Sequence, residues 1–126
     1  MMATLAGDDR PARILIVDDD EAVREAVCEA LATLGYLVEP ARDAGDALGR
    51  FHPGRYQLVV TDLAMPVMNG LELARQLRAL EPGLPIVIFS GAVPGGLPSI
   101  SVGFTVSLKP DVEGLIRLIT RALEAP

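Results

Sequence analysis

Acidic residues follow two of the apolar runs in this sequence. Asp18 and Asp19 come directly after one run, and Asp62 follows another. Carboxylates that are crowded together repel one another and raise each other's pKa. A hard divalent cation such as Mg²⁺, which takes oxygen ligands, removes that repulsion. Two or three carboxylates together with a backbone carbonyl would therefore make a magnesium site.

A hydroxyl and a lone lysine stand at two further run ends. Ser90 ends one apolar run, and Lys109, the only lysine in the chain, follows another. Lysine is a compact point charge that suits one phosphate oxygen or one carboxylate. A carboxylate beside a metal and a cation can act as a nucleophile, so Asp62 could attack phosphorus and form an aspartyl phosphate. The metal and Lys109 would neutralise the transferring group, and the Ser90 hydroxyl could donate to one of its oxygens.

Each of these residues also has an ordinary structural explanation. The acids at 18–20 could begin a helix, where the helix dipole favours them, and we assign Asp20 and Glu21 to that role. Asp62 could be a turn residue, and the Ser90 hydroxyl could bond to nearby backbone. The lone lysine could reflect codon bias. Because all of these explanations would have to coincide at one edge of the molecule, we favour a shared site.

The elements that would position these residues alternate between strand and helix. Continuous apolar runs predict buried strands, and apolar residues three and four apart predict helices. This alternation predicts an α/β fold with a parallel sheet covered on both faces. Ligands of such sheets bind beyond the carboxyl ends of the strands, which is where the polar residues stand. The predicted strands are 13–17, 36–39, 56–61, 85–90 and 104–108, and the predicted helices are 20–34, 43–51, 70–80 and 111–123.

Glycine and proline predict where several elements end. Gly35 should stop the first helix and Pro40 should close the second strand, while Asp111 is suited to cap the last helix. The segment 91–103 departs from the alternation because its glycines and prolines disfavour a helix. We expect a loop or one irregular turn there, so the fourth helix should be short or missing.

Composition limits the possible classes of protein. The chain has 126 residues, half of them hydrophobic, which fits one domain with an aliphatic core; we assign 1–12 to a tail and 13–124 to the domain. The net charge of −6 argues against direct binding to nucleic acid or anionic membrane. Cys28 is the only cysteine, so an internal disulfide is excluded. The apolar runs are too short to span a bilayer, and the N-terminus does not resemble a signal peptide, so we expect a cytoplasmic protein.

Arg75 and Arg78 stand three residues apart on one predicted helix, and we expect both side chains to be solvated.

Four motifs resemble the receiver domain of two-component response regulators. They are ILIVDDDEAVR (14–24), VVTDLAMPVMNGLEL (59–73), PIVIFSG (85–91) and LKPD (108–111). Four motifs in this order and at this spacing are highly specific, and the match runs from about Arg13 to Leu123. The resemblance implies a flavodoxin-like, doubly wound fold with five parallel strands in the order 2-1-3-4-5.

The resemblance also implies a role for each polar residue. Asp62 would be the phosphoacceptor and a metal ligand. Asp18 and Asp19 would be the other metal-binding acids, with Asp19 the more direct ligand. The backbone carbonyl of Ala64 would complete the protein ligands of Mg²⁺.

The phosphoryl group would be sensed and paired by two further residues. By resemblance, Ser90 senses it and Lys109 pairs with it, and the Lys109–Pro110 bond is expected to be cis. The donor would be a histidine kinase or a histidine phosphotransfer protein, and the switched surface would bind an output partner that the sequence does not identify. Such a domain is not a classical enzyme, since it catalyses its own phosphorylation and dephosphorylation.

The sequence departs from the family's pattern near its readout. Val106 stands where the family usually has an aromatic residue, Phe104 is out of register, and Asp111 stands where phenylalanine is common. The interval from Ser90 to Lys109 is also short. We therefore hypothesise that phosphorylation orders or releases the loop 91–103.

Two other functions are considered. A pseudo-receiver would keep the fold for protein binding alone, and the altered fourth helix region allows this. A phosphatase of the haloacid dehalogenase type also uses an aspartate nucleophile and magnesium. That family requires a second Asp two residues after the first, where this chain has Ala64.

Overall fold

The sheet has five parallel strands in the order β2-β1-β3-β4-β5. A computed structural model describes residues 10–91 and 104–124. β1 pairs with β2 and β3, β3 pairs with β4, and β4 pairs with β5, all in parallel. The predicted doubly wound, five-stranded fold is thus confirmed. The strands are β1 (Arg13–Val17), β2 (Leu37–Ala41), β3 (Leu58–Thr61), β4 (Ile86–Ser90) and β5 (Thr105–Leu108).

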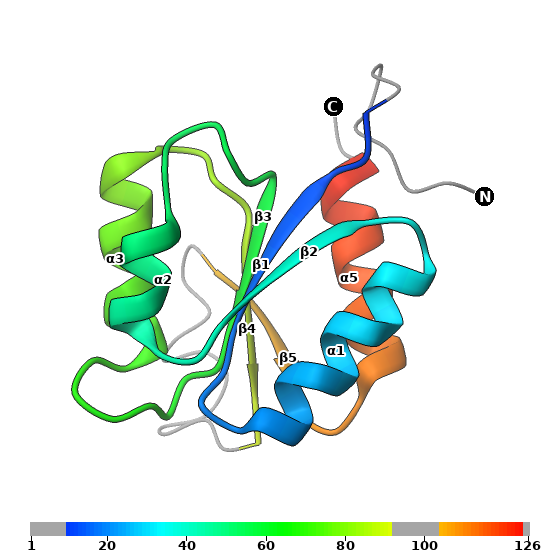
Figure 1. Cartoon of the computed structure of the whole chain (residues 1–126), viewed down its shortest axis with the longest axis horizontal. Coiled ribbons are helices and arrows are strands. Elements are labelled where there is room, and N and C mark those ends of the chain that lie inside the picture. Colours follow the sequence, from blue (N-terminus) through cyan, green and yellow to red (C-terminus); the bar gives the residue numbers. More distant parts are fainter. Residues whose placement is uncertain (1–9, 92–103, 125–126) are drawn as a thin grey trace.

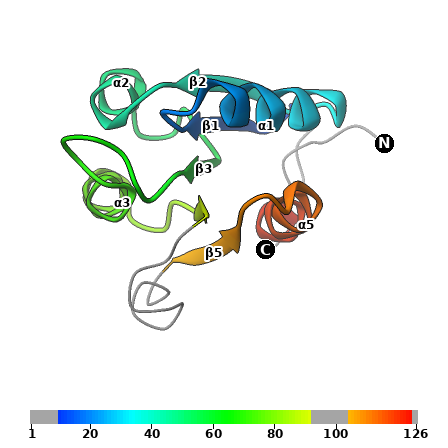
Figure 2. The ribbon, with the colours of Figure 1, turned by 90° about the horizontal axis from the view of Figure 1, so that it is seen from below.

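Helices cover both faces of this sheet. α1 (Glu21–Thr33) and α5 (Val112–Glu124) lie on one face. α2 (Ala44–Arg50) and α3 (Gly70–Leu80) lie on the other, as the view along the sheet shows (Figure 1; Figure 2). The carboxyl ends of the strands are thereby left as the edge at which loops from both faces meet.

Successive residues of a strand point to opposite faces of the sheet. Because helices cover both faces, the central strands are buried on both sides. In β1, Ile14 and Ile16 belong to the apolar cluster under α1 and α5. Leu15 and Val17 belong to the cluster under α2 and α3. Both clusters are mainly aliphatic, as the composition predicts, and they fix the strand ends that carry the polar residues.

Helix ends follow the predicted chemistry. The Asp20 side chain caps α1 by accepting hydrogen bonds from the backbone of Ala22 and Val23. Gly35, with φ of 98°, ends the first helical segment. Asp111 Oδ1 accepts the Gly114 N–H at 2.8 Å at the start of α5.

Two predictions are corrected by the described residues. β2 does not close at Pro40 but includes it, and an edge strand tolerates a proline because one side of the strand needs no donor. Arg78 is not freely solvated: it is half-buried, its Nε donates to the Leu84 carbonyl at 2.8 Å, and its guanidinium lies 4.8 Å from the centroid of the Phe104 ring.

The fourth helix region and the hypothesis of a switching loop concern 92–103, which lies outside the described residues. Among the described helices, none is long and apolar enough to cross a bilayer.

Candidate functional site

The backbones of Asp18 and Asp62 are held by hydrogen bonds to the ends of neighbouring strands. The backbone N–H of Asp18 donates to the Ala41 carbonyl at 3.1 Å, and that of Asp62 donates to the Val17 carbonyl at 2.9 Å. Asp18 is 3% exposed and Asp62 is 6% exposed. Two buried acids therefore stand side by side at the carboxyl edge of the sheet, in accord with the rule for ligand sites of parallel sheets.

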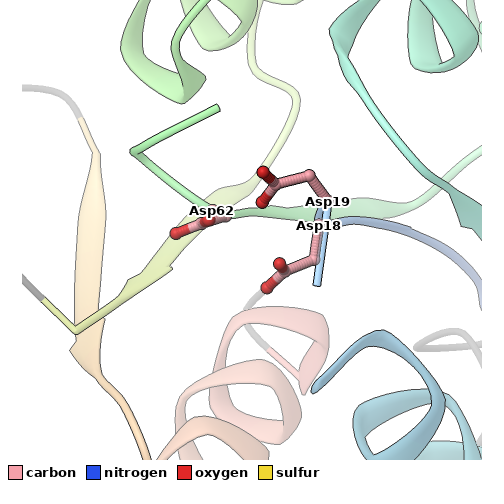
Figure 3. A group of neighbouring side chains, drawn as sticks. All are labelled: Asp18, Asp19 and Asp62. Carbon is pink, nitrogen blue, oxygen red and sulfur yellow. The ribbon is translucent and has the colours of Figure 1, made fainter. Parts of the chain in front are cut away.

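Asp19 completes a cluster of three carboxylates. Figure 3 shows the side chains of Asp18, Asp19 and Asp62 close together beyond the ends of β1 and β3. One carboxylate oxygen from each lies within 4.8 Å of the others, and Asp19 is exposed. Oxygens bound to Mg²⁺ lie roughly 3 to 4 Å apart, since each is about 2.1 Å from the ion. The donor set and its spacing thus fit Mg²⁺ after a small contraction.

Lys109 joins the two buried acids. Its Nζ lies 2.9 Å from Asp18 Oδ2 and 3.4 Å from Asp62 Oδ1. It lies 6.0 Å from the centroid of the Phe89 ring. The predicted cis bond between Lys109 and Pro110 is present. A partly exposed ammonium shared by two buried carboxylates is suited to neutralise further negative charge brought to Asp62.

Charge and burial shift the pKa of both partners. Burial raises the pKa of Asp62, the neighbouring Asp18 carboxylate raises it further, and Lys109 only partly offsets this. Burial lowers the pKa of Lys109, but its hydrogen bond and charge interaction with Asp18, aided by Asp62, outweigh burial and raise it. Asp62 is therefore more basic than an ordinary aspartate, while Lys109 stays charged.

The remaining predicted residues lie at the same edge. Ser90 is 2% exposed at the end of β4, and its carbonyl accepts the Lys109 N–H at 3.0 Å. Ala64 is exposed in the loop that follows β3. The structure thus brings together Asp18, Asp19, Asp62 and Lys109 and places Ser90 beside the lysine backbone, while the Ala64 carbonyl stays a prediction as a metal ligand.

Sequence reasoning gave no role to two residues that hold the site. Arg24, inside the first motif, donates from Nη1 to the Asp18 carbonyl at 2.8 Å. Gly70 packs so closely that an added Cβ would overlap the Asp62 carbonyl. The Asn69–Gly70 pair indicates a turn, but only the folded chain shows which backbone atom the glycine faces.

The sheet order, with helices on both faces, is that of a doubly wound α/β fold, and the acid cluster and its lysine lie at the carboxyl edge of its strands. The family model for the response regulator receiver domain matches residues 14–95, which is well over half of the chain. The chain belongs to this family, and it is a receiver domain of the kind found in two-component systems. Receiver domains of response regulators interact with histidine kinases, and this assignment does not favour the phosphatase or pseudo-receiver alternatives.

Sequence relatives are longer proteins. Response regulator MprA of Mycolicibacterium vanbaalenii is 46% identical over 80 residues, which cover 64% of this chain and 35% of that protein. MprA of Mycobacterium avium is 45% identical over 78 residues, covering 62% and 34%. The chain therefore spans about a third of the length of these relatives.

Solved structures match over nearly the whole chain. Vibrio cholerae CheY4 is 30% identical with a TM-score of 0.81, covering 90% of this chain and 100% of that one. A CheY-like receiver from Methanospirillum hungatei is 29% identical with a TM-score of 0.84, covering 91% and 95%. Thermotoga maritima TrrA, solved in complex with Mg²⁺-BeF, is 29% identical with a TM-score of 0.81, covering 89% and 99%.

Proposed function

We propose that Asp62 is the phosphoacceptor of this receiver domain and takes a phosphoryl group from a histidine kinase or a histidine phosphotransfer protein. The observation that carries the proposal is the position of Lys109 Nζ between the carboxylates of Asp18 and Asp62. A lysine so placed can follow the negative charge when a phosphoryl group is added to Asp62.

The transfer is a substitution at phosphorus. An Asp62 carboxylate oxygen forms the new P–O bond while the P–N bond of the phosphohistidine breaks, and the electron pair leaves with the imidazole nitrogen. Asp62 is held for attack because its backbone is bound to the end of β1. Lys109 balances charge on the phosphoryl oxygens, and the Ser90 hydroxyl is proposed to donate to one of them.

Mg²⁺ is the proposed cofactor. Asp18, Asp19 and Asp62 would hold it together with the Ala64 carbonyl, and the bound ion would supply neutralisation of the oxygens around phosphorus. The support is the spacing of the three carboxylates and the solved complex of TrrA with Mg²⁺-BeF.

The test is the mass of the intact protein after incubation with phosphoramidate and Mg²⁺. We expect the gain of one phosphoryl group, lost when Mg²⁺ is chelated and lost in Asp62→Asn. Asp20→Asn is the matched control, because Asn also caps a helix and Asp20 lies outside the carboxylate cluster. Addition in Asp62→Asn equal to wild type would overturn the assignment.

Beryllofluoride provides a second arm that needs no phosphodonor. Mg²⁺ with BeF₃⁻ should give a bound fluorine NMR signal in wild type and none in Asp62→Asn. A wild-type chain that gains no phosphoryl group and binds no beryllofluoride would overturn the phosphoacceptor function itself.

A further inference from the structure

Arg24 contacts the turn that leads from β1 into α1. Its backbone N–H donates to the Asp20 carbonyl at 2.9 Å, and its Nη1 donates to the Asp18 carbonyl at 2.8 Å. Arg24 thereby binds the carbonyls of both Asp18 and Asp20, the first and last residues of the acidic turn 18–20. The Asp18 carbonyl belongs to the peptide group that joins Asp18 to Asp19, so the guanidinium fixes the plane of that peptide group.

The second peptide group flanking Asp19 is fixed as well. The Asp20 N–H donates to Asp18 Oδ1 at 2.9 Å. Asp18 itself is held by the Ala41 carbonyl through its N–H and by Lys109 through Oδ2. The backbone of Asp19 is therefore set from one side by Arg24 and from the other by the Asp18 carboxylate.

The Asp19 side chain has no such support of its own. It is exposed, and within residues 10–91 and 104–124 its carboxylate has neither a hydrogen bond nor an ion pair. Its oxygen nevertheless lies within 4.8 Å of the oxygens of Asp18 and Asp62. The position of this carboxylate thus depends on how its backbone is held.

We propose that Arg24 is a positioning residue for the divalent cation, acting through the Asp18–Asp19 peptide group to aim the Asp19 carboxylate at the ion. This inference rests on the proposed function, because it requires that the carboxylate cluster binds Mg²⁺. Groups that orient metal ligands without touching the metal typically change affinity about 10- to 100-fold when removed.

The sign of the effect separates positioning from charge. Arg24 is a cation beside a cation site, so its charge alone opposes Mg²⁺ binding. If Arg24 acted only through its charge, Arg24→Met would bind Mg²⁺ more tightly. If Arg24 positions Asp19, the same variant binds Mg²⁺ more weakly even though a repelling charge has been removed.

The experiment is titration calorimetry of the full chain with MgCl₂ at constant ionic strength. We expect the Kd of Arg24→Met to rise about tenfold and that of Arg24→Lys, which keeps the charge and one donor, to rise less. Arg117→Met, which removes an exposed arginine from α5, is the charge-matched control and should match wild type. Circular dichroism confirms that each variant is folded, and Arg24→Lys serves if Arg24→Met does not fold.

The outcomes are distinct. A Kd in Arg24→Met equal to or lower than that of wild type would overturn the positioning role while leaving the metal site intact. A wild-type chain that binds no Mg²⁺ would overturn the metal site and the role of Arg24 together. A loss of stability in Arg24→Met with unchanged affinity would show that Arg24 only supports the turn, and this too would overturn the proposal.

Discussion

At the scale of single residues, Lys109 contacts two of the three carboxylates that are proposed to hold a divalent cation. Lys109 Nζ is closer to Asp18, at 2.9 Å, than to Asp62, at 3.4 Å. The ammonium thus offsets part of the negative charge of the two buried acids. If Mg²⁺ and a phosphoryl group bind as proposed, the same ammonium would be placed to turn toward the new negative charge. Lys109 would then balance the charge of Asp18 and Asp62 before the proposed reaction and that of the phosphoryl group during it.

Lys109→Met should separate metal binding from phosphoryl transfer. Removing the ammonium leaves Asp18 and Asp62 less neutralised, so Mg²⁺ should bind several-fold more tightly by Coulomb attraction. Phosphorylation by phosphoramidate should slow about a hundredfold, because one group that balances transition-state charge is lost. Calorimetry and intact mass measure the two effects, and a parallel loss of both would contradict this division of roles.

Val67 has a backbone conformation that is unfavourable for its β-branched side chain. Its φ is 71°, its side chain is fully exposed, and the Met68 N–H donates to the Pro66 carbonyl at 2.8 Å across it in a γ-turn. Positive φ is costly for β-branched residues and tolerated by Asn.

Val67→Asn should therefore raise the free energy of unfolding by about 1 kcal/mol, because it relieves the backbone and loses no packing. Val67→Ile keeps the branch at Cβ and should leave stability unchanged. Urea denaturation of both variants tests this, and equal stability of Val67→Asn and wild type would show that the turn carries no strain.

At the scale of elements, the connection from β3 to α3 decides where Asp62 stands. The Gly70 N–H donates to the Leu63 carbonyl at 2.8 Å, and the Asn69 side chain caps α3 by accepting the Glu72 N–H at 2.9 Å. The start of α3 is thereby pressed against the backbone of Asp62, which leaves no space for a side chain at position 70.

Gly70→Ala should displace that backbone, since its Cβ would overlap the Asp62 carbonyl. We expect a loss of about 2 kcal/mol or more in unfolding free energy and slower phosphorylation. Gly49→Ala in α2 is the matched control: its Cβ would meet nothing within 4 Å, and Ala in a helix should add about 0.5–1 kcal/mol. Equal effects at both positions would refute the steric argument.

Glu39 links the edge strand β2 to its neighbours. Its carboxylate lies 3.0 Å from Arg55 Nη2 and 3.6 Å from Arg13 Nη1. Burial raises the pKa of Glu39, but the hydrogen bond from Arg55 and the charges of Arg55 and Arg13 outweigh burial and lower it. The folded chain therefore holds this proton less tightly than the unfolded chain.

The stabilisation from Glu39 is complete above the unfolded pKa of about 4.3 and is lost as pH falls through the lowered folded pKa. Glu39→Gln should cost about 0.5–1 kcal/mol at neutral pH, because the pairs are partly exposed. The difference from wild type should shrink in acid. Urea titrations at neutral pH and near pH 3 measure it, and a difference that does not change with pH would exclude the ionised carboxylate as its source.

At the scale of the whole molecule, the sequence predicts the sheet and most of the site because both depend on order along the chain. Runs such as 13–17 are buried on both faces, and the residues that end them must meet at one edge. Side-chain contacts that no strand end or motif marks cannot be predicted in this way. Helical spacing predicts a solvated Arg78, because it shows the face of the helix but not that Phe104 lies beneath it. The role of Arg24 has no such signal in the sequence, since its partner is a backbone carbonyl.

The whole chain also carries a net charge of −6, which attracts cations diffusely as well as at the cluster. Binding to the folded site raises stability by RT ln(1 + [Mg²⁺]/Kd), about 2.7 kcal/mol at a hundredfold excess over Kd. We expect millimolar Mg²⁺ to raise the Tm by several degrees at constant ionic strength, and K⁺ at matched ionic strength to have no such effect. Asp19→Asn removes a proposed ligand whose carboxylate has no hydrogen bond or ion pair within the described residues, so its own Tm should hardly change while the response to Mg²⁺ disappears. If Mg²⁺ raised the Tm of wild type and Asp19→Asn equally, the stabilisation would come from the overall negative charge and not from the three carboxylates.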